Sequence, residues 1–101
     1  MIQGKIKMRA KVWLYPGMAG WHFITLPKTR GQEIKELFGN KKIRGFGSIP
    51  VMVTIGKTSW KTSIFPDKKS GSYVLPIKTE IRKKENISIG DNITFQIEIK
   101  I

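Results

Sequence analysis

The sequence predicts an all-β fold with a small α content, arranged as a closed or nearly closed barrel. Three observations lead to this class. Short segments alternate between apolar and polar residues, glycine and proline separate these segments, and only two stretches have a helical pattern. With 101 residues, the chain is expected to form one domain, residues 1–101, that buries a core without disulfide or metal support.

Residues 5–14 form the first predicted strand, because apolar and polar positions alternate strictly along them. One face carries Ile6, Met8, Ala10, Val12 and Leu14. The other face carries Lys5, Lys7, Arg9, Lys11 and Trp13. Pro16 and the neighbouring glycines then predict a turn, and a second strand follows over residues 21–26 until Pro27 ends it.

A short amphipathic helix is predicted from about one residue after Thr29 to Phe38. Thr29 and Gln32 have the spacing of a capping box, and Gly39 stands where a helix commonly stops. The apolar stripe of this helix consists of Ile34, Leu37 and Phe38.

A Gly-rich basic loop over residues 40–48 leads into a predicted hairpin. Its strands are residues 49–55 and 59–65, its turn is residues 56–58, and Pro66 is expected to end it. The chain is completed by a polar turn, a strand over residues 72–78, a helical turn or two over residues 79–86 and a last strand over residues 92–101.

The two halves of the chain share a faint pattern. Leu26 and Pro27 follow an aromatic strand and precede the first helix, just as Leu75 and Pro76 follow Tyr73 and precede the second helical turn. A barrel built from two similar halves, with pseudo-twofold symmetry, would produce this repeat.

Residues 81–97, IRKKENISIGDNITFQI, resemble the half-barrel unit of AbrB/MazE-type transcription factors. The positions that match its spacing are Ile81, Arg82, Ile87, Gly90, Asp91, Ile93 and Phe95. Glu85 departs from the pattern, which has an apolar residue there.

Over almost its whole length the chain more closely resembles the domain of unknown function 1905 family. Three blocks carry this resemblance: VWLYPGMAGWHFITLP, RGFGSIPVMVTIG, and SWKTSIFPDKKSGSYVLPIK followed by IGD. The resemblance implies a double-split β barrel in which one chain supplies both of the halves that AbrB-like proteins assemble from two chains. The protein is therefore expected to be a monomer, and the resemblance implies no activity.

The charge of the chain is strongly positive. Nineteen Lys and Arg residues stand against seven Asp and Glu residues, which gives a formal net charge of +12. This excess is larger than solubility requires and favours a polyanionic partner. Because lysine dominates it, contact with a phosphate backbone is expected rather than reading of bases. The alternative is a compositional origin, through an AT-rich genome or the lysine enrichment of heat-adapted proteins.

The first predicted strand presents the clearest electrostatic feature. Residues on one face of a strand lie about 6.8 Å apart, so the cations at residues 5–11 form a ladder about 20 Å long that a nucleic-acid backbone could follow. The alternative is that lysines protect a sheet edge from aggregation. The predicted polyanion-binding set is Lys5, Lys7, Arg9, Lys11, Arg44, Lys68, Lys69, Arg82 and Lys83.

A second hypothesis places a small molecule or peptide in an aromatic cleft of the barrel. Its predicted lining is Trp13, Tyr15, Trp21, His22, Trp60 and Phe65. Exposed tryptophan beside cations also suits stacking on single-stranded nucleic acid, whereas covered tryptophan indicates ordinary packing. The exposure of Trp13 and Trp21 therefore decides between a site and a core.

Enzymatic chemistry is not expected. His22 is the only histidine, the seven acids show no ligand spacing, and no motif places a serine beside a base, so neither a metal nor a cofactor is predicted. The glycines of residues 45–47 and 70–72 are best explained as turns rather than phosphate cradles. Without cysteine, a signal peptide or an apolar span, the chain is expected in the cytoplasm, away from membranes.

Overall fold

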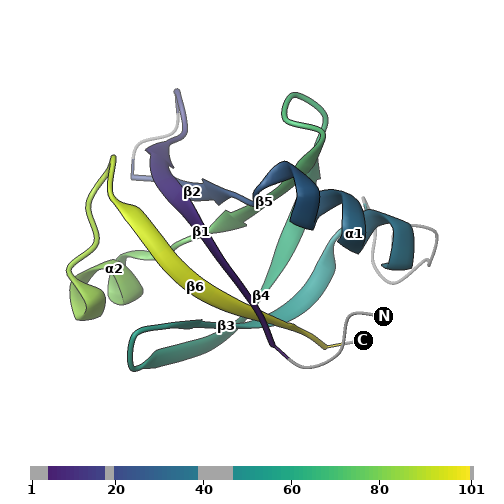
Figure 1. Cartoon of the computed structure of the whole chain (residues 1–101). Coiled ribbons are helices and arrows are strands. Elements are labelled where there is room, and N and C mark those ends of the chain that lie inside the picture. The colour runs from purple at the N-terminus through teal and green to yellow at the C-terminus, as the bar shows by residue number, and fades with distance from the viewer. Residues whose placement is uncertain (1–4, 18–19, 39–46, 101) are drawn as a thin grey trace.

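The computed structural model describes residues 5–17, 20–38 and 47–100, and in it the chain forms a closed antiparallel barrel (Figure 1). The order of strands around the barrel is β1-β2-β5-β4-β3-β6. The strands are β1 (Lys5–Leu14), β2 (His22–Thr25), β3 (Ile49–Ile55), β4 (Thr58–Asp67), β5 (Ser72–Pro76) and β6 (Asn92–Ile99). The helices are α1 (Lys28–Phe38) and α2 (Thr79–Glu85). The predicted β barrel with two short helical pieces is confirmed.

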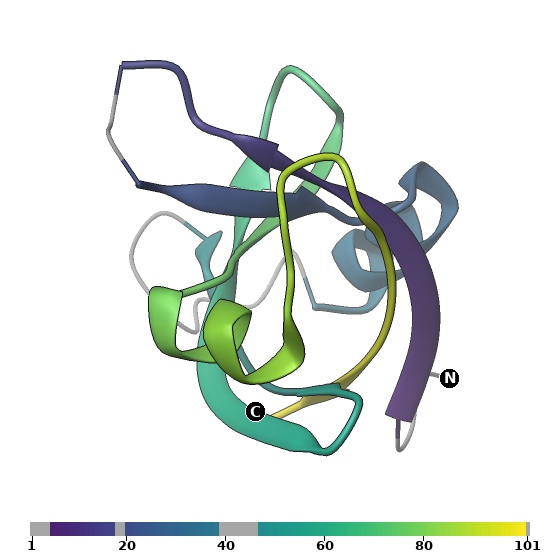
Figure 2. The ribbon, with the colours of Figure 1, turned by 90° about the vertical axis from the view of Figure 1, so that its left-hand side faces the viewer.

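The long strands β1 and β4 each take part in two sheets. Residues 5–11 of β1 pair with β6, whereas residues 12–14 pair with β2. Residues 58–64 of β4 pair with β3, whereas residues 65–67 pair with β5. Sheet A therefore has the order β1-β6-β3-β4, and sheet B has the order β1-β2-β5-β4. Figure 2 shows β1, in purple, as a long curved strand that passes from one sheet to the other.

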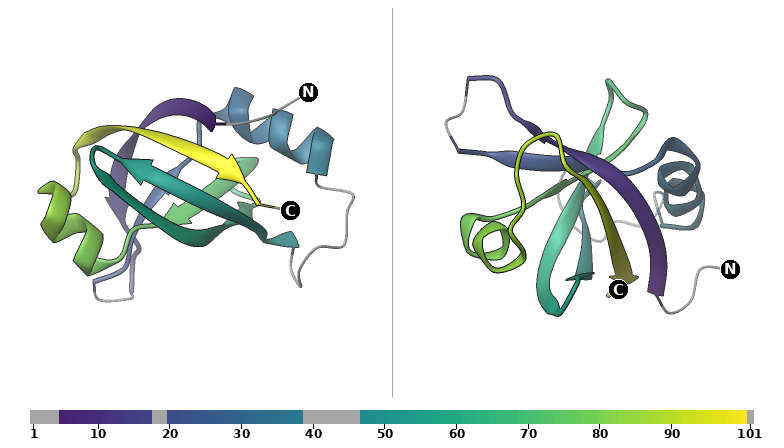
Figure 3. Two further views of the ribbon diagram at one scale, coloured as in Figure 1. Left: turned by 90° about the horizontal axis from the view of Figure 1, so that it is seen from below. Right: turned by 60° about the vertical axis from the view of Figure 1, so that its left-hand side comes forward.

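The two halves of the chain repeat one element order, β1-β2-α1-β3 and then β4-β5-α2-β6. Exchanging β1 with β4, β2 with β5 and β3 with β6 leaves the set of strand pairs unchanged. The helices α1 and α2 lie on opposite sides of the barrel (Figure 3). The predicted pseudo-twofold arrangement is thus present in the topology.

Alternation along the strands fills the interior with one apolar core. The inward residues of β3 are Ile49, Val51, Val53 and Ile55, and all four are buried as predicted. Phe95 of β6 and Ile24 of β2 are among the largest side chains that are fully enclosed. Leu14 has the inward parity of β1 but is 44% exposed, because it lies at the end of the strand.

The start of α1 differs from the prediction. The helix begins at Lys28, and the first helical hydrogen bond joins the Gly31 N–H to the Pro27 carbonyl at 2.9 Å. Thr29 therefore lies inside the first turn rather than before it, and the predicted capping box is wrong. Ile34 is buried as expected, whereas Leu37 is exposed. The predicted stop at Gly39 lies outside the described residues.

Gly31 allows α1 to approach β5. The Ser72 hydroxyl donates a hydrogen bond to the Leu26 carbonyl at 2.9 Å, and a Cβ atom on Gly31 would overlap that hydroxyl. The absence of a side chain at this position therefore determines how closely the helix packs on sheet B.

Pro66 does not end β4, contrary to the prediction. The strand continues to Asp67, and Pro66 pairs with Tyr73. Among the residues that the structure describes, this part of β4 has β5 on one side and no strand partner on the β3 side. The missing N–H of proline can face that side without loss of a ladder bond.

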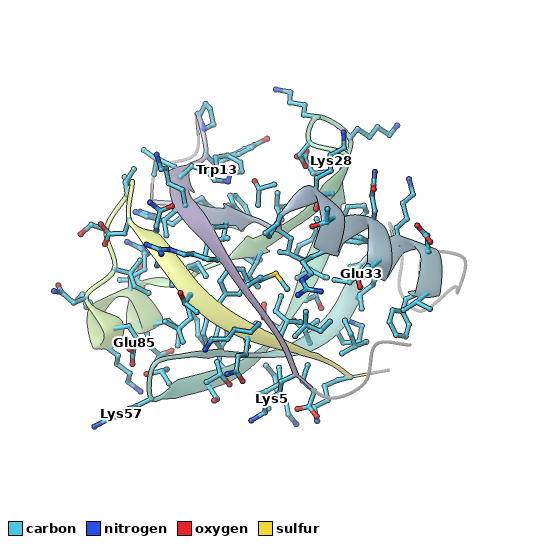
Figure 4. The ribbon with its side chains drawn as sticks, in the orientation of Figure 1. Lys5, Trp13, Lys28, Glu33, Lys57 and Glu85 are labelled. Atoms are coloured by element: carbon cyan, nitrogen blue, oxygen red, sulfur yellow. The ribbon has the colours of Figure 1, made fainter. Side chains whose placement is uncertain are left out.

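The end of helix α2 contacts the turn between β3 and β4. The Thr58 hydroxyl donates to the Glu85 carboxylate at 2.6 Å, and Asn86 ends the helix in the left-handed conformation, with φ of 54°. Glu85 and the turn residue Lys57 lie near one another in Figure 4.

Neither of the helices among the described residues is long and apolar enough to cross a membrane.

Candidate functional site

The first four odd-numbered residues of β1 form a row of exposed cations on the outer face of sheet A. These residues are Lys5, Lys7, Arg9 and Lys11, and together they are called the ladder below. Their partners across the strand pair with β6 are Glu98, Gln96, Thr94 and Asn92 in the same order. Three of the four cations therefore face neutral polar side chains.

The charges of the ladder are not neutralised within the described part of the chain. The ion pairs there join Arg30 to Glu33, Lys78 to Glu80 and Lys100 to Glu98. Glu98 lies opposite Lys5 on the neighbouring strand, but its carboxylate is 3.3 Å from the Lys100 ammonium. Sheet A thus presents free positive charge along one strand.

The remaining strands of sheet A add little negative charge to this face. Lys61 lies exposed on β4 opposite Met52, and the hydroxyls of Thr54 and Ser59 lie 2.8 Å apart. Among the described strand residues of sheet A, Glu98 is the only acid. Within the described ranges, residues 5–11 have a hydrogen-bonded strand on one side only, so protection of a sheet edge remains the competing explanation for these lysines.

Sheet B has an entirely different outer face. Its exposed and half-buried rings are Trp13, Tyr15, Trp21, Phe23 and Phe65, together called the aromatic surface below. Trp21 is 50% exposed, Tyr15 42% and Phe65 40%. An apolar group of this size on the outside of a small barrel is a candidate binding surface.

The rings of the aromatic surface pack against one another. The ring centroids of Trp13 and Phe23 are 5.4 Å apart, those of Tyr15 and Phe23 are 5.6 Å apart, and those of Trp21 and Phe23 are 5.9 Å apart. The Trp13 indole N–H donates to the Thr25 hydroxyl at 2.9 Å. The rings are therefore held in place before any ligand binds.

Strand pairing explains why these rings gather. Trp13 pairs with Phe23, Phe23 pairs with Pro76, and Phe65 pairs with Val74, so all of these side chains leave sheet B on its outer side. The ring cluster is a product of long-range pairing among β1, β2, β5 and β4.

Two adjoining pockets lie on this surface. The first has a volume of about 410 Å³ and lies among Trp13, Tyr15, Phe23 and Asp67. The second has a volume of about 400 Å³ and lies among His22, Thr62, Lys78 and Thr79. Both are also lined by Trp21, Phe65 and Pro76. Each volume falls in the range of small-ligand sites.

Arg82 and His22 support the edge of the second pocket. The Arg82 guanidinium donates to the carbonyls of Ile77 and Gly20 at 3.2 and 3.3 Å, and to the Thr79 hydroxyl at 2.8 Å. It also lies 3.3 Å from the His22 Nε2 atom. Because a guanidinium can only donate, His22 Nε2 accepts, and its Nδ1 donates to the Gly20 carbonyl at 2.9 Å. These contacts hold the residues before β2 against α2.

The ladder and the aromatic surface meet on β1. Lys11 and Trp13 are successive outward residues of this strand, so their side chains lie about 6.8 Å apart along it. Figure 4 shows Lys5 and Trp13 at opposite ends of the strand. The row of cations on β1 therefore ends next to the cluster of rings.

The sequence profile described as "Domain of unknown function (DUF1905)" matches residues 9–97. The chain belongs to the DUF1905 family. No curated protein sequence matches it. The DUF1905 match contains every ring of the aromatic surface and begins within the ladder, at Arg9. The family description assigns no activity.

The DUF1905 barrel brings most of the predicted cleft residues together. Each of five predicted residues lines at least one of the two pockets, namely Trp13, Tyr15, Trp21, His22 and Phe65. Trp60 does not, because its side chain is 8% exposed and belongs to the core. Phe65 lies five positions after Trp60 on β4, and side chains an odd number of positions apart point to opposite faces of a strand.

Several lining residues lie outside the predicted set, and on the outer face of sheet B these include Phe23, Val74 and Pro76. Phe23 of β2 lies two positions after Trp21, which directly precedes the strand, and this shared parity was available in the sequence. Val74 and Pro76 reach the cleft through the pairing of β5 with β2 and β4, which no local pattern reveals.

The predicted cations fall into three groups. The ladder is exposed and without ion pairs in the described residues, and Lys68, Lys69 and Lys83 are also exposed. Arg82 instead bonds to the barrel itself. Arg44 lies outside the described residues. No three His, Cys, Asp or Glu side chains in the described ranges are grouped to hold a metal ion.

Proposed function

We propose that this DUF1905 domain is a non-enzymatic binding module that engages nucleic acid or another polyanion along β1. The observation that carries the proposal is the ladder, a row of four exposed cations that have no ion pair in the described chain. The net charge of +12 adds a long-range attraction for polyanions. The exposed Lys68, Lys69 and Lys83 supply further contacts from the β4–β5 turn and from α2.

The proposal has a quantitative consequence. A protein that contacts four phosphates releases condensed counterions, and log K then falls with log salt at a slope of about −3 to −4. Binding through the ladder is therefore strong at low salt and weak at high salt. Lysine side chains contact phosphate as point charges, so little preference among base sequences is expected.

Fluorescence anisotropy with labelled duplex and single-stranded DNA and RNA across a salt series tests the proposal. Absence of binding at low salt would refute it. The double variant Lys7→Gln/Arg9→Gln should lower both the affinity and the slope. The matched control Lys35→Gln/Lys84→Gln removes the same charge from exposed positions on the two helices and should retain most of the slope.

A second candidate function is the binding of a small molecule or peptide in the aromatic cleft. Two adjoining pockets of about 400 Å³ support it, since ligand sites commonly have such volumes and apolar linings. A screen of metabolites by tryptophan fluorescence tests it, because Trp21 lines both pockets and Trp13 lines the first.

The proposal includes three further expectations from the sequence. The domain acts as a monomer in the cytoplasm, and its barrel is of the double-split type that AbrB-like proteins assemble from two chains. The pseudo-twofold strand pairing within one chain supports the first and third expectations. Sedimentation of the purified chain tests the first, since a dimer would contradict it.

A further inference from the structure

We infer that the partner is a single-stranded nucleic acid whose backbone follows the ladder and whose unpaired bases stack on the aromatic surface, an inference that rests on the proposed function. The two regions form one continuous site because β1 contributes to both. The partner must therefore offer phosphate and exposed ring faces side by side.

The geometry of β1 joins the two chemistries. Beyond Lys11 the next outward position is Trp13, which begins the ring cluster. A single-stranded nucleic acid whose backbone lies along β1 therefore passes from Lys11, the last cation, to the indole of Trp13. In proteins that bind single strands without sequence preference, cations track the backbone while aromatic rings stack on successive bases.

The rings are prepared for stacking. Centroid distances of 5.4 to 6.1 Å and the bond from Trp13 to Thr25 fix their arrangement, yet half of the Trp21 side chain remains exposed. Stacking on a fixed ring avoids most of the entropy that a mobile side chain would lose on binding. The two pockets share Trp21, Phe65 and Pro76, so ligand rings can lie on either side of this shared wall.

The charges around the aromatic surface favour an anionic occupant. Lys11 lies at its β1 side, and Lys68 and Lys69 follow β4 directly. Lys78 also lines the second pocket, but its ammonium lies 3.3 Å from the Glu80 carboxylate, so the first three cations carry the attraction. A neutral apolar peptide would gain nothing from these cations. A chain that carries both negative charge and flat rings matches the surface in both respects.

Asp67 favours bases over phosphates in the first pocket. Asp67 lines the first pocket, and its carboxylate accepts a hydrogen bond from the Ser70 N–H at 3.2 Å. A carboxylate repels phosphate but accepts hydrogen bonds from base amino groups. The backbone is therefore expected on the ladder and the bases among the rings.

Duplex nucleic acid fits this surface poorly. In a duplex the faces of the bases are covered by their neighbours, and only the base edges are accessible in the grooves. The rings of the aromatic surface could then not stack, and the ladder would act alone. Preference for single strands thus distinguishes a composite site from a simple basic face.

The test uses the whole chain and four fluorescent probes, with affinities measured at one low salt concentration. The probes are a single strand of about 12 nucleotides, the same strand annealed to its complement, inorganic polyphosphate and an acidic peptide that contains tyrosine. The single strand should bind more tightly than the other three. Trp21→Ala and Phe65→Ala should each weaken it by about 5- to 150-fold, the loss of one stacked base, and leave polyphosphate unchanged.

The controls separate folding from binding. Leu37→Ala removes a similarly exposed apolar side chain from α1 and should change no affinity. Trp21→Tyr keeps a ring and should restore most of the affinity lost in Trp21→Ala. Thermal unfolding of each variant verifies that the barrel is intact.

The possible failures are distinguishable. If no polyanionic probe binds at low salt, the proposed function fails and the inference fails with it. If polyphosphate and duplex bind as tightly as the single strand, or the ring variants leave single-strand affinity unchanged, the inference is overturned while the proposed function stands. Tighter binding of the acidic peptide, lost in Trp21→Ala, would make the surface a peptide site and also overturn the inference.

Discussion

The outer faces of sheets A and B differ sharply although both sheets contain β1 and β4. Sheet A presents the ladder and neutral polar groups, whereas sheet B presents the aromatic surface. The inner faces of the same sheets are alike, because both contribute aliphatic side chains to one core. The difference that bears on function is therefore confined to outward positions.

This contrast shows how a small barrel can place two chemistries side by side without a long loop. β1 passes from sheet A to sheet B between Lys11 and Val12, and its alternation continues through the junction. The outward positions of a single strand thus change from cations to rings. Their relative placement is determined by backbone geometry rather than by loop conformation.

Breaking the shared core should have the largest effect on both faces. Phe95→Ala removes a ring that is enclosed in the interior, and such truncations cost about 3 to 5 kcal/mol. Because one core supports both sheets, urea unfolding followed by tryptophan fluorescence and by far-UV circular dichroism should shift together. Separate transitions would show that the sheets unfold independently. Phe65→Ala, on the exposed aromatic surface, is the control and should cost far less.

The next effect should come from Arg82, the predicted cation that bonds to the barrel. Arg82→Gln removes donors to Gly20 and His22 and should lower the free energy of unfolding by about 1 to 2 kcal/mol, since the group is only partly buried. Lys83→Gln removes the same charge from an exposed neighbour and should leave stability unchanged. Chemical unfolding of both variants measures the difference, and equal stabilities would contradict the structural role of Arg82.

The strands and their faces could be predicted because alternation is a local signal. The core faces of β3 and β6 and the outward cations of β1 follow directly from it. The start of α1 could not be predicted from Thr29 and Gln32, because the Pro27 carbonyl accepts the bond that begins the helix. Local cap patterns do not show which upstream carbonyl is available.

The candidate site was only partly predictable, for a different reason. Five of its six proposed cleft residues lie in the pockets, but Val74 and Pro76 are brought there by long-range strand pairing. The passage of β1 from one sheet to the other is likewise a property of the closed barrel. Alternation already places Trp13 on the same face as the ladder, but the gathering of the other rings around Trp13 emerges only in three dimensions.

A smaller effect should follow from a single ladder cation. Lys7→Gln should reduce the magnitude of the salt slope for nucleic-acid binding by about 1, with a modest loss of affinity at low salt. Lys35→Gln, on the exposed face of α1, serves as the matched control in the same titrations. If Lys7→Gln aggregates while its slope stays unchanged, the lysines protect a sheet edge and do not bind phosphate.

The smallest effect concerns Tyr73, a buried residue of β5 in sheet B. Burial raises the pKa of the Tyr73 phenol above its ordinary value of 10.0, so the unfolded chain ionises first as the pH rises. The contribution to stability is complete below about pH 10 and is lost as the pH climbs through the raised pKa. Urea unfolding should show a steeper alkaline loss for the native chain than for Tyr73→Phe, and equal losses would contradict this role.

The central claim is that the ladder and the aromatic surface form one site, and NMR titration of the isotope-labelled chain with a short single strand tests it most directly. The account predicts that amide signals of residues 5–13, the Trp13 indole signal and the signals of Trp21, Phe23 and Phe65 shift together and saturate at one ligand concentration. Shifts confined to one of the two outer faces, or two sets of signals that saturate at different concentrations, would contradict it.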